Sequence, residues 1–247
     1  LKGIAMFNSK VLVTLISFLF MFPVFSEDIE EIVVTALKRS STVIDTPASI
    51  TAIGANEIED KGITDMNDLK HLIPSMNFTS VLGAQNITIR GIGQFNGNPG
   101  VSVSTDGVFQ SRAHSSQLGE MDLERIEVLR GPQGTLFGKN TTAGLINIIT
   151  NTPSQEREAK IRLGAGSDSH QLIEGMFNTP INDSLSFRFS FLTKETDGFM
   201  INSITGKDRG NEDTTSFRAQ LRYDNEAYSC LLYTSDAADE EDSVDLG

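Results

Sequence analysis

The sequence predicts a mixed α+β domain followed by antiparallel strands with one apolar and one polar face, which are either the first strands of a truncated transmembrane β-barrel or part of a soluble β-sandwich. Two observations carry this prediction. Between residues 37 and 153, short β-prone runs alternate with two short helical patterns and glycine-rich turns, which is typical of a small α+β domain. After Pro153 the runs become longer, and apolar residues alternate with polar or basic ones, as in strands that have lipid on one face and water on the other.

Composition excludes several classes of function. The formal net charge of the 247 residues is −13, whereas a nucleic-acid-binding protein needs a basic face. The chain has one cysteine, Cys230, and three widely spaced histidines, so neither a disulfide framework nor a metal-ligand cluster is expected. We therefore expect no nucleic-acid partner, no bound metal and no cofactor.

The amino terminus predicts export from the cytoplasm. Lys10 precedes an apolar run of 14 residues, Val11–Val24. The run is shorter than the ~20 residues that a transmembrane helix needs, so a cleaved secretory signal over residues 1–26 is favoured over a spanning helix. Cleavage is expected after Ser26, and Met6 is a better start than Leu1.

A short β-prone run lies in the next segment, residues 27–36. Its sequence from Glu30 is Glu-Glu-Ile-Val-Val-Thr-Ala. Such a run can add as a strand to the exposed sheet edge of a partner, or it can be the first strand of the folded domain. The residues alone leave both interpretations open.

Alternation and turn residues predict the elements of the central domain, residues 37–153. Met66, Leu69 and Leu72 fall on one helix face, and Pro74 ends that helix. Asp106-Gly107 lies between apolar-rich runs, which is a hairpin signal. Strands are expected at 46–53, 86–90, 101–105, 126–129 and 144–150, and helices at 57–61 and 65–72.

The glycine-rich stretch Leu129–Gly138 has the sequence Leu-Arg-Gly-Pro-Gln-Gly-Thr-Leu-Phe-Gly. Its glycines allow tight turns and close backbone approach. Their spacing is not that of a phosphate-binding loop, because Gly138-Lys139 is followed by Asn140, and it is not that of a dinucleotide fingerprint.

Residues 31–153 resemble the plug domain of TonB-dependent outer-membrane receptors. The Leu129–Gly138 stretch is close to a signature of that family, and Ile89-Arg90-Gly91 and Asp106-Gly107 stand where the plug has them. One departure is Ala143-Gly144, where the family usually has a second glycine. The resemblance implies an α+β plug domain over residues 37–153, followed by a barrel that begins at residue 154.

The resemblance also implies roles for particular residues. Residues 32–36 resemble the TonB box, the segment that binds the energy-transducing protein TonB in the periplasm; they are Ile32, Val33, Val34, Thr35 and Ala36. Arg90 and Arg130 match the plug arginines that pair with barrel glutamates, because a guanidinium forms bidentate bonds to carboxylates. The alternative is that both are ordinary arginines in solvated turns.

Two polar loops are candidates for cargo contact, since plug apices in the family face the cell exterior. The loops span residues 94–99 and 109–116, and the candidate side chains are Phe95, Phe109, Arg112 and His114. The alternative is that these are solvated loops with no ligand.

Residues 154–229 contain about four strands with one apolar and one polar face. The clearest run alternates Leu185, Phe187, Phe189 and Phe191 with serines and Arg188. Asn182-Asp183-Ser184 is expected to be a short turn, and residues 197–213 a longer connection. A soluble β-sandwich could alternate in the same way, and the preceding plug-like domain favours the membrane barrel.

The segment 230–247 has a different character. Cys230–Glu240 closely resembles the translation of a transposase sequencing adapter, and the segment carries six acids and no base. We expect that the natural sequence departs from this chain near Ser229 and that Cys230 is foreign. Plugged transporters have about 22 strands, so a chain with about four should not function alone.

The resemblance implies active transport of a scarce nutrient rather than enzymatic catalysis. A ferric siderophore or similar metal chelate is the favoured cargo, and carbohydrate, haem or cobalamin remain open. Expected partners are TonB, outer-membrane lipid and the small-molecule cargo. The competing hypotheses are a plug-like binding module and a periplasmic enzyme, for which no nucleophile elbow, HExxH or Cys–His motif is present.

Overall fold

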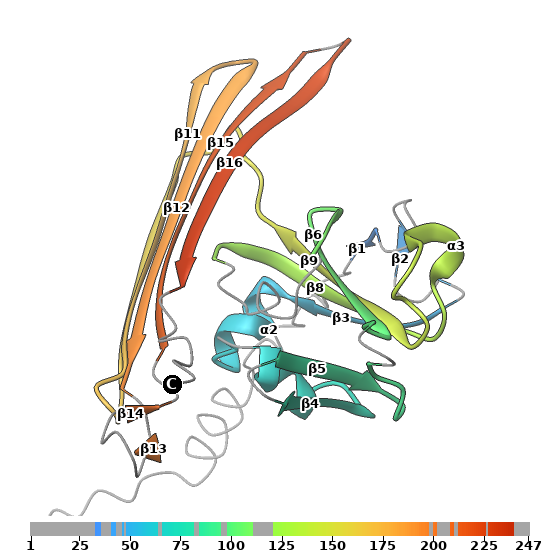
Figure 1. The fold of residues 1–247 in the computed structure, drawn as a ribbon. Helices are drawn as coiled ribbons and strands as arrows, with labels where there is room; N and C mark the ends of the chain where they lie inside the picture. Colours follow the sequence, from blue (N-terminus) through green and yellow to red (C-terminus); the bar gives the residue numbers. More distant parts are fainter. Residues whose placement is uncertain are drawn as a thin grey trace, which may run out of the picture. The chain divides into compact units, whose positions relative to one another are not determined.

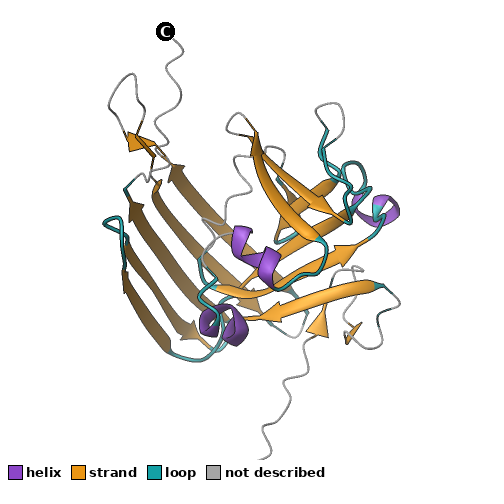
Figure 2. Cartoon of the chain, turned by 90° about the horizontal axis from the view of Figure 1, so that it is seen from below, coloured by secondary structure: helices purple, strands orange, loops and turns teal. Residues whose placement is uncertain are grey.

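The computed structural model describes most of the chain beyond the predicted export signal (Figure 1). The described residues are 33–35, 41–42, 46, 48–63, 66–81, 84–94, 98–110, 121–197, 200–201, 208–209, 212–225 and 227–239. Residues 1–26, Ile32 and Ala36, to which the sequence analysis assigned functions, lie outside these ranges. Strands dominate the described part, and its helices are short (Figure 2).

A five-stranded mixed sheet forms the centre of the first domain. Its strand order is β3-β8-β9-β6-β7. The long strand β8 pairs antiparallel with both β3 and β9, whereas β6 is parallel to β9. The bounds are β3 Ser49–Gly54, β6 Val101–Thr105, β7 Val108–Phe109, β8 Leu123–Arg130 and β9 Gly144–Thr150. These strands confirm the β-prone runs predicted from the sequence.

Short elements cover this sheet and complete its core. They are α2 Ala55–Asp60, η1 Met66–His71, β4 Met76–Val81, β5 Ala84–Ile89 and α3 Gly134–Phe137. Met66, Leu69 and Ile73 are at most 1% exposed and belong to the same cluster as Ile126 and Ile146 of the sheet. The predicted second helix is therefore placed correctly, and it is a short 3-10 helix.

The second sheet is antiparallel, and its strands follow one another in sequence order. It contains β10 Glu158–Ala165, β11 Gln171–Asn182, β12 Leu185–Thr196, β15 Glu212–Asp224 and β16 Ser229–Asp239. Ile161 and Leu163 are 68% and 71% exposed, whereas Ser186 and Arg188 are buried. The apolar face of the sheet is thus exposed and the polar face covered, which is the alternation predicted for a lipid-facing barrel wall.

Strand β16 differs from the expectation that the strand pattern ends near Ser229. All residues of β16, Ser229–Asp239, pair in register with Thr214–Asp224 of β15. The edge of β15 presents free N–H and C=O groups, and any β-capable run that follows can satisfy them. The origin of this segment remains a prediction.

The remaining strands are short. They are β1 Val33–Val34, β2 Ser41–Thr42, β13 Met200–Ile201 and β14 Asp208–Arg209. The predicted turn at residues 182–184 and the longer connection after β12 are both present, and the latter carries the β13–β14 pair. Within the described ranges, no helix has the length and apolar character needed to cross a membrane.

Candidate functional site

Residues 33–35, the described part of the segment that resembles the TonB box (the box-like segment), lie against the plug domain. Val33 and Val34 form β1 and pair with Thr42 and Ser41 of β2. The side chain of Val34 is 1% exposed and belongs to a small cluster with Ile50, Leu129 and Leu145, whereas Val33 is 48% exposed. The segment is therefore anchored through one valine and presents the other.

A buried carboxylate holds the next residue of this segment. Glu127 of β8 is fully buried, and its Oε1 accepts a hydrogen bond of 2.8 Å from the backbone N–H of Thr35. Arg125 Nε donates to the same oxygen at 2.8 Å, and Asn147 Nδ2 donates to Oε2 at 3.2 Å. Arg125 Nη2 also donates to Thr35 Oγ1 at 3.0 Å. Thr35 is thus bound to the centre of the plug sheet through both its main chain and its hydroxyl.

A cavity of about 670 Å³ adjoins this segment. Val33, Thr35 and Phe109 all contribute to its lining, together with the Asp106-Gly107 turn. Asp106 and Gly107 have φ of 48° and 83°, as a tight hairpin requires, and the Asp106 carboxylate accepts bonds of 2.9 and 2.7 Å from Thr150. Phe109 therefore lies on the same cavity as the box-like segment. Phe95, Arg112 and His114 lie outside the described residues.

The side chains of the two predicted anchoring arginines both contact strand β3. Arg90 has a φ of 53° and its Nη2 lies 3.5 Å from Ser49 Oγ. Arg130 pairs in register with Ser49, and its Nη2 donates to Thr51 Oγ1 at 3.3 Å. Within the described ranges neither arginine forms an ion pair, and the buried Nε of Arg130 has no hydrogen-bond partner. The guanidinium groups are thus gathered at one end of the plug sheet.

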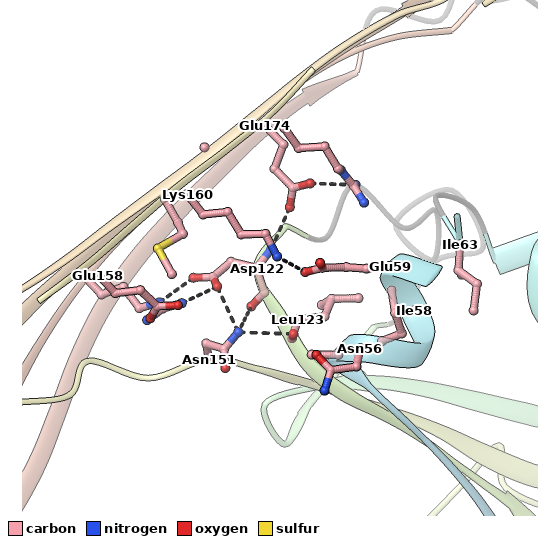
Figure 3. A pocket seen from close by; sticks show the side chains of 15 residues that line it. Asn56, Ile58, Glu59, Ile63, Asp122, Leu123, Asn151, Glu158, Lys160 and Glu174 are labelled. Atoms are coloured by element: carbon pink, nitrogen blue, oxygen red, sulfur yellow. Dashed lines mark hydrogen bonds and ion pairs between the residues drawn. The ribbon is translucent and has the colours of Figure 1, made fainter. Parts of the chain in front are cut away.

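A second polar cluster, which sequence reasoning missed, joins the plug domain to the second sheet. Asp122 directly precedes β8, and its carboxylate accepts bonds of 2.6 and 2.5 Å from Arg188 Nε and Nη2 of β12. Asn151 points at the same carboxylate (Figure 3) and donates at 2.9 Å. Burial alone would raise the pKa of Asp122, but these hydrogen bonds and the charge of Arg188 hold that pKa below its ordinary value of 3.8.

Neither Glu127 nor Asp122 carried a sequence signal that identified it. Glu127 alternates with apolar neighbours on a strand, which is equally typical of a solvated face. Asp122 stands at the edge of a polar loop. The sequence did contain one indication of such a carboxylate. Arg188 is a cation on the polar face of a strand, and a cation on a buried face needs a carboxylate partner. Among the residues that the structure describes, no group of His, Cys, Asp and Glu could hold a metal ion.

Comparisons with known proteins agree with this arrangement. Residues 42–145 match the family model of the TonB-dependent receptor plug domain. The chain is 34% identical over 188 residues to the pesticin receptor of Yersinia pestis, a match that covers 74% of this chain and 28% of that protein. It is 30% identical over 210 residues to the vitamin B12 transporter BtuB of Vibrio vulnificus, covering 81% of this chain and 34% of that protein.

Solved structures give the same result. The ferric yersiniabactin uptake receptor FyuA from Yersinia pestis superposes with a TM-score of 0.72 at 29% identity, over 77% of this chain and 31% of that one. The ferripyoverdine receptor of Pseudomonas aeruginosa has a TM-score of 0.70 at 21% identity, over 86% and 28% of the two chains, and shows the fold alone. The chain spans only 28% to 34% of the length of these relatives.

The matches cover both the plug sheet and the strands that follow it, and the matched relatives are receptors and transporters. Residues 42–145 are therefore a TonB-dependent receptor plug domain, and the chain is similar to the N-terminal part of TonB-dependent outer-membrane receptors.

Proposed function

We propose that the receptor to which this sequence belongs imports a scarce nutrient across the outer membrane, driven by TonB through residues 32–36. The observation that carries the proposal is the binding of Thr35 to the buried Glu127. Force applied to the segment before Thr35 would act through that carboxylate on β8, the strand between β3 and β9. A pull at the N-terminus would therefore reach β8 inside the plug sheet.

The chemistry of TonB binding is strand addition. Val33 is half exposed and its strand β1 has only two residues, so little pairing is lost when a partner strand replaces β2. Main-chain hydrogen bonds supply the affinity in such complexes. We propose TonB in the periplasm as that partner and outer-membrane lipid as the surroundings of the second sheet.

The cargo that we propose is a ferric siderophore or a similar metal chelate. Support comes from the ferric yersiniabactin uptake receptor, which is 29% identical over 77% of this chain. The vitamin B12 transporter of Vibrio vulnificus is 30% identical, which keeps cobalamin as the second candidate, while carbohydrate and haem are weaker ones. Arg90, Arg130, Phe95, Phe109, Arg112 and His114 remain proposals for plug anchoring and cargo contact.

A matched pair of variants at Val33 tests the TonB step in the complete receptor. Val33→Pro removes a main-chain N–H that strand addition uses, whereas Val33→Ala keeps it. We expect uptake of ⁵⁵Fe-labelled siderophores to be lost in Val33→Pro and in a deletion of residues 31–36, with cargo binding to intact cells unchanged. Uptake that survives both changes would refute TonB-driven import through this segment.

The cargo class needs a separate experiment. Cells that express the complete receptor would be given ⁵⁵Fe-labelled catecholate, hydroxamate and phenolate siderophores and ⁵⁷Co-cobalamin, with and without TonB. TonB-dependent accumulation of one ferric chelate supports the proposed cargo class. Accumulation of cobalamin alone would refute it and identify cobalamin as the cargo. A plug-like binding module would bind a ligand but accumulate nothing.

A further inference from the structure

We propose that Met121 and Asp122 form the attachment point of the plug on the second sheet, with Asp122 as the positioning residue. The proposal concerns how the plug is held and does not depend on import or on the identity of the cargo. The charges are the reverse of those expected at Arg90 and Arg130. There the plug would supply the cation, whereas here the plug supplies the carboxylate and the second sheet supplies the cation.

Both oxygens of the Asp122 carboxylate accept hydrogen bonds. Arg188 binds both of its oxygens in a bidentate pair, and Ser190 Oγ of the same strand donates to Oδ2 at 2.6 Å. The side chains of Arg188 and Asp122 are only 4% and 6% exposed. Asn151 completes the set from the plug side. A bidentate guanidinium–carboxylate pair fixes orientation as well as distance, so β12 sets the position of Asp122 in more than one direction.

The main chain at this point is bound to two further strands. The N–H of Asp122 donates to Glu174 Oε1 of β11 at 3.2 Å, a contact visible in Figure 3. The carbonyl of Met121 accepts a bond of 3.2 Å from Arg218 Nη1 of β15. Asp122 has a φ of 57°, a conformation that residues other than glycine seldom adopt. Surrounding contacts must therefore hold it there.

Met121 adds an apolar contact beside the ion pair. Its side chain is 2% exposed and forms a cluster with Leu172 of β11 and Leu192 of β12. Both leucines are buried although much of the apolar surface of this sheet is exposed. Two consecutive plug residues thus contact β11, β12 and β15 through an ion pair, two main-chain groups and one buried side chain.

A second ion pair between the plug and this sheet, among the residues that the structure describes, is of a different kind. Lys160 of β10 pairs with Glu59 of α2, but these side chains are 49% and 44% exposed. Exposed pairs contribute little because water and salt screen them. The buried pair at Asp122 is therefore the stronger constraint, and β8 begins at the next residue.

A double-mutant cycle in the complete receptor tests the attachment point in cells that lack TonB, so that import plays no part. The variants are Asp122→Asn, Arg188→Met and their combination, and the readout is passive entry of vancomycin, measured as sensitivity. Each single variant should raise sensitivity by about tenfold, because a charge loses its buried partner. The double variant should raise it by less than the product of the two single effects.

The same cycle on Glu57→Gln and Lys61→Met is the matched control. Glu57 lies in α2 and Lys61 directly follows that helix. Their side chains are exposed, with Lys61 Nζ 2.5 Å from Glu57 Oε1, so substitution of this pair should leave sensitivity unchanged. Independent, multiplicative effects at Asp122 and Arg188 would overturn the proposal, and so would equal effects in the control cycle.

A milder substitution tests the attachment point even if the variants at Asp122 and Arg188 fail to assemble. Ser190→Ala keeps both charges and removes one bond to Asp122. In the purified receptor we expect the amides of residues 123–130 to exchange hydrogen about threefold to tenfold faster, since a lost hydrogen bond weakens the attachment. Exchange in the β4–β5 hairpin should not change. Unchanged exchange at the start of β8 would refute the attachment point.

Discussion

At the scale of single residues, Glu127 determines how firmly the box-like segment is held. A fully buried carboxylate is unfavourable unless its oxygens are bound, and here Thr35, Arg125 and Asn147 donate to it, Thr35 through both its N–H and its hydroxyl. Loss of the Thr35 contact would leave two donors in place. Glu127 can therefore release the segment without becoming an unpaired buried charge, which makes the contact with Thr35 separable from the fold of the plug.

Replacing Glu127 by glutamine tests this role. The amide of glutamine has one acceptor oxygen where the carboxylate has two, and Arg125 loses a buried counter-ion, so each affected bond should weaken by about 1–3 kcal/mol. We expect the amide of Thr35 to exchange hydrogen between about fivefold and about 150-fold faster, measured by NMR or mass spectrometry. Glu124→Gln is the control, because Glu124 also pairs with Arg125 but is 44% exposed. Equal effects of the two variants would contradict the role of Glu127.

The pH dependence of plug attachment follows from Asp122. Its pKa is lower in the folded protein than the ordinary value of 3.8. A carboxyl with a lowered pKa contributes stability above its unfolded pKa and loses it as pH falls through the folded pKa. We therefore expect attachment to be constant from pH 7 to about 5 and to weaken below about pH 4. Hydrogen exchange of residues 123–130 measures it, and Asp122→Asn should remove part of the acid-induced change.

At the scale of elements, the pairing of β8 and β9 depends on a close approach at Gly144. A Cβ added there would lie 2.3 Å from the carbonyl oxygen of Leu129, which is backbone and cannot move aside cheaply. Gly144→Ala should therefore destabilise the plug by about 1–3 kcal/mol, as over-packing typically does. Urea unfolding of the purified receptor measures the change.

Gly134 of α3 is the matched control for this substitution. A Cβ there would meet only Thr141 Oγ1, at 3.9 Å, and alanine favours helix over glycine by up to about 1 kcal/mol. Gly134→Ala should be neutral or slightly stabilising. A loss of stability as large as that of Gly144→Ala would show that the close approach at Gly144 is not the cause.

The elements also show what sequence reasoning could and could not predict. A strand with strict alternation, such as β12, was predicted because period-two patterning marks a face. Strand β4 was missed because Met76–Val81 is short and follows a helix end, where a turn is equally plausible. The contact of Thr35 with Glu127 spans 92 residues of sequence, and no local pattern encodes such a pair.

At the scale of the whole described chain, the second sheet has an inverted distribution of polarity. Arg188, Ser190 and Gln220 are buried, whereas Ile161, Leu163 and Phe177 are exposed. In water the apolar residues would be the ones to bury. Large exposed apolar surfaces mark a binding surface or a membrane, and regular alternation over several adjacent strands favours lipid. The alternation was predictable from its period of two, whereas the exposure of its apolar face was expected only because the preceding domain resembles a plug.

A substitution on that face distinguishes lipid from water. Leu163 is 71% exposed on β10; if its surroundings are hydrocarbon, Leu163→Arg should destabilise the complete receptor in liposomes by up to about 2–4 kcal/mol. Ile92, which is 50% exposed in a plug turn, is the control, and Ile92→Arg should change stability by less than about 0.5 kcal/mol. Urea unfolding in liposomes measures both. If Leu163→Arg is as harmless as Ile92→Arg, this face meets water, and the sheet belongs to a soluble sandwich rather than a barrel wall.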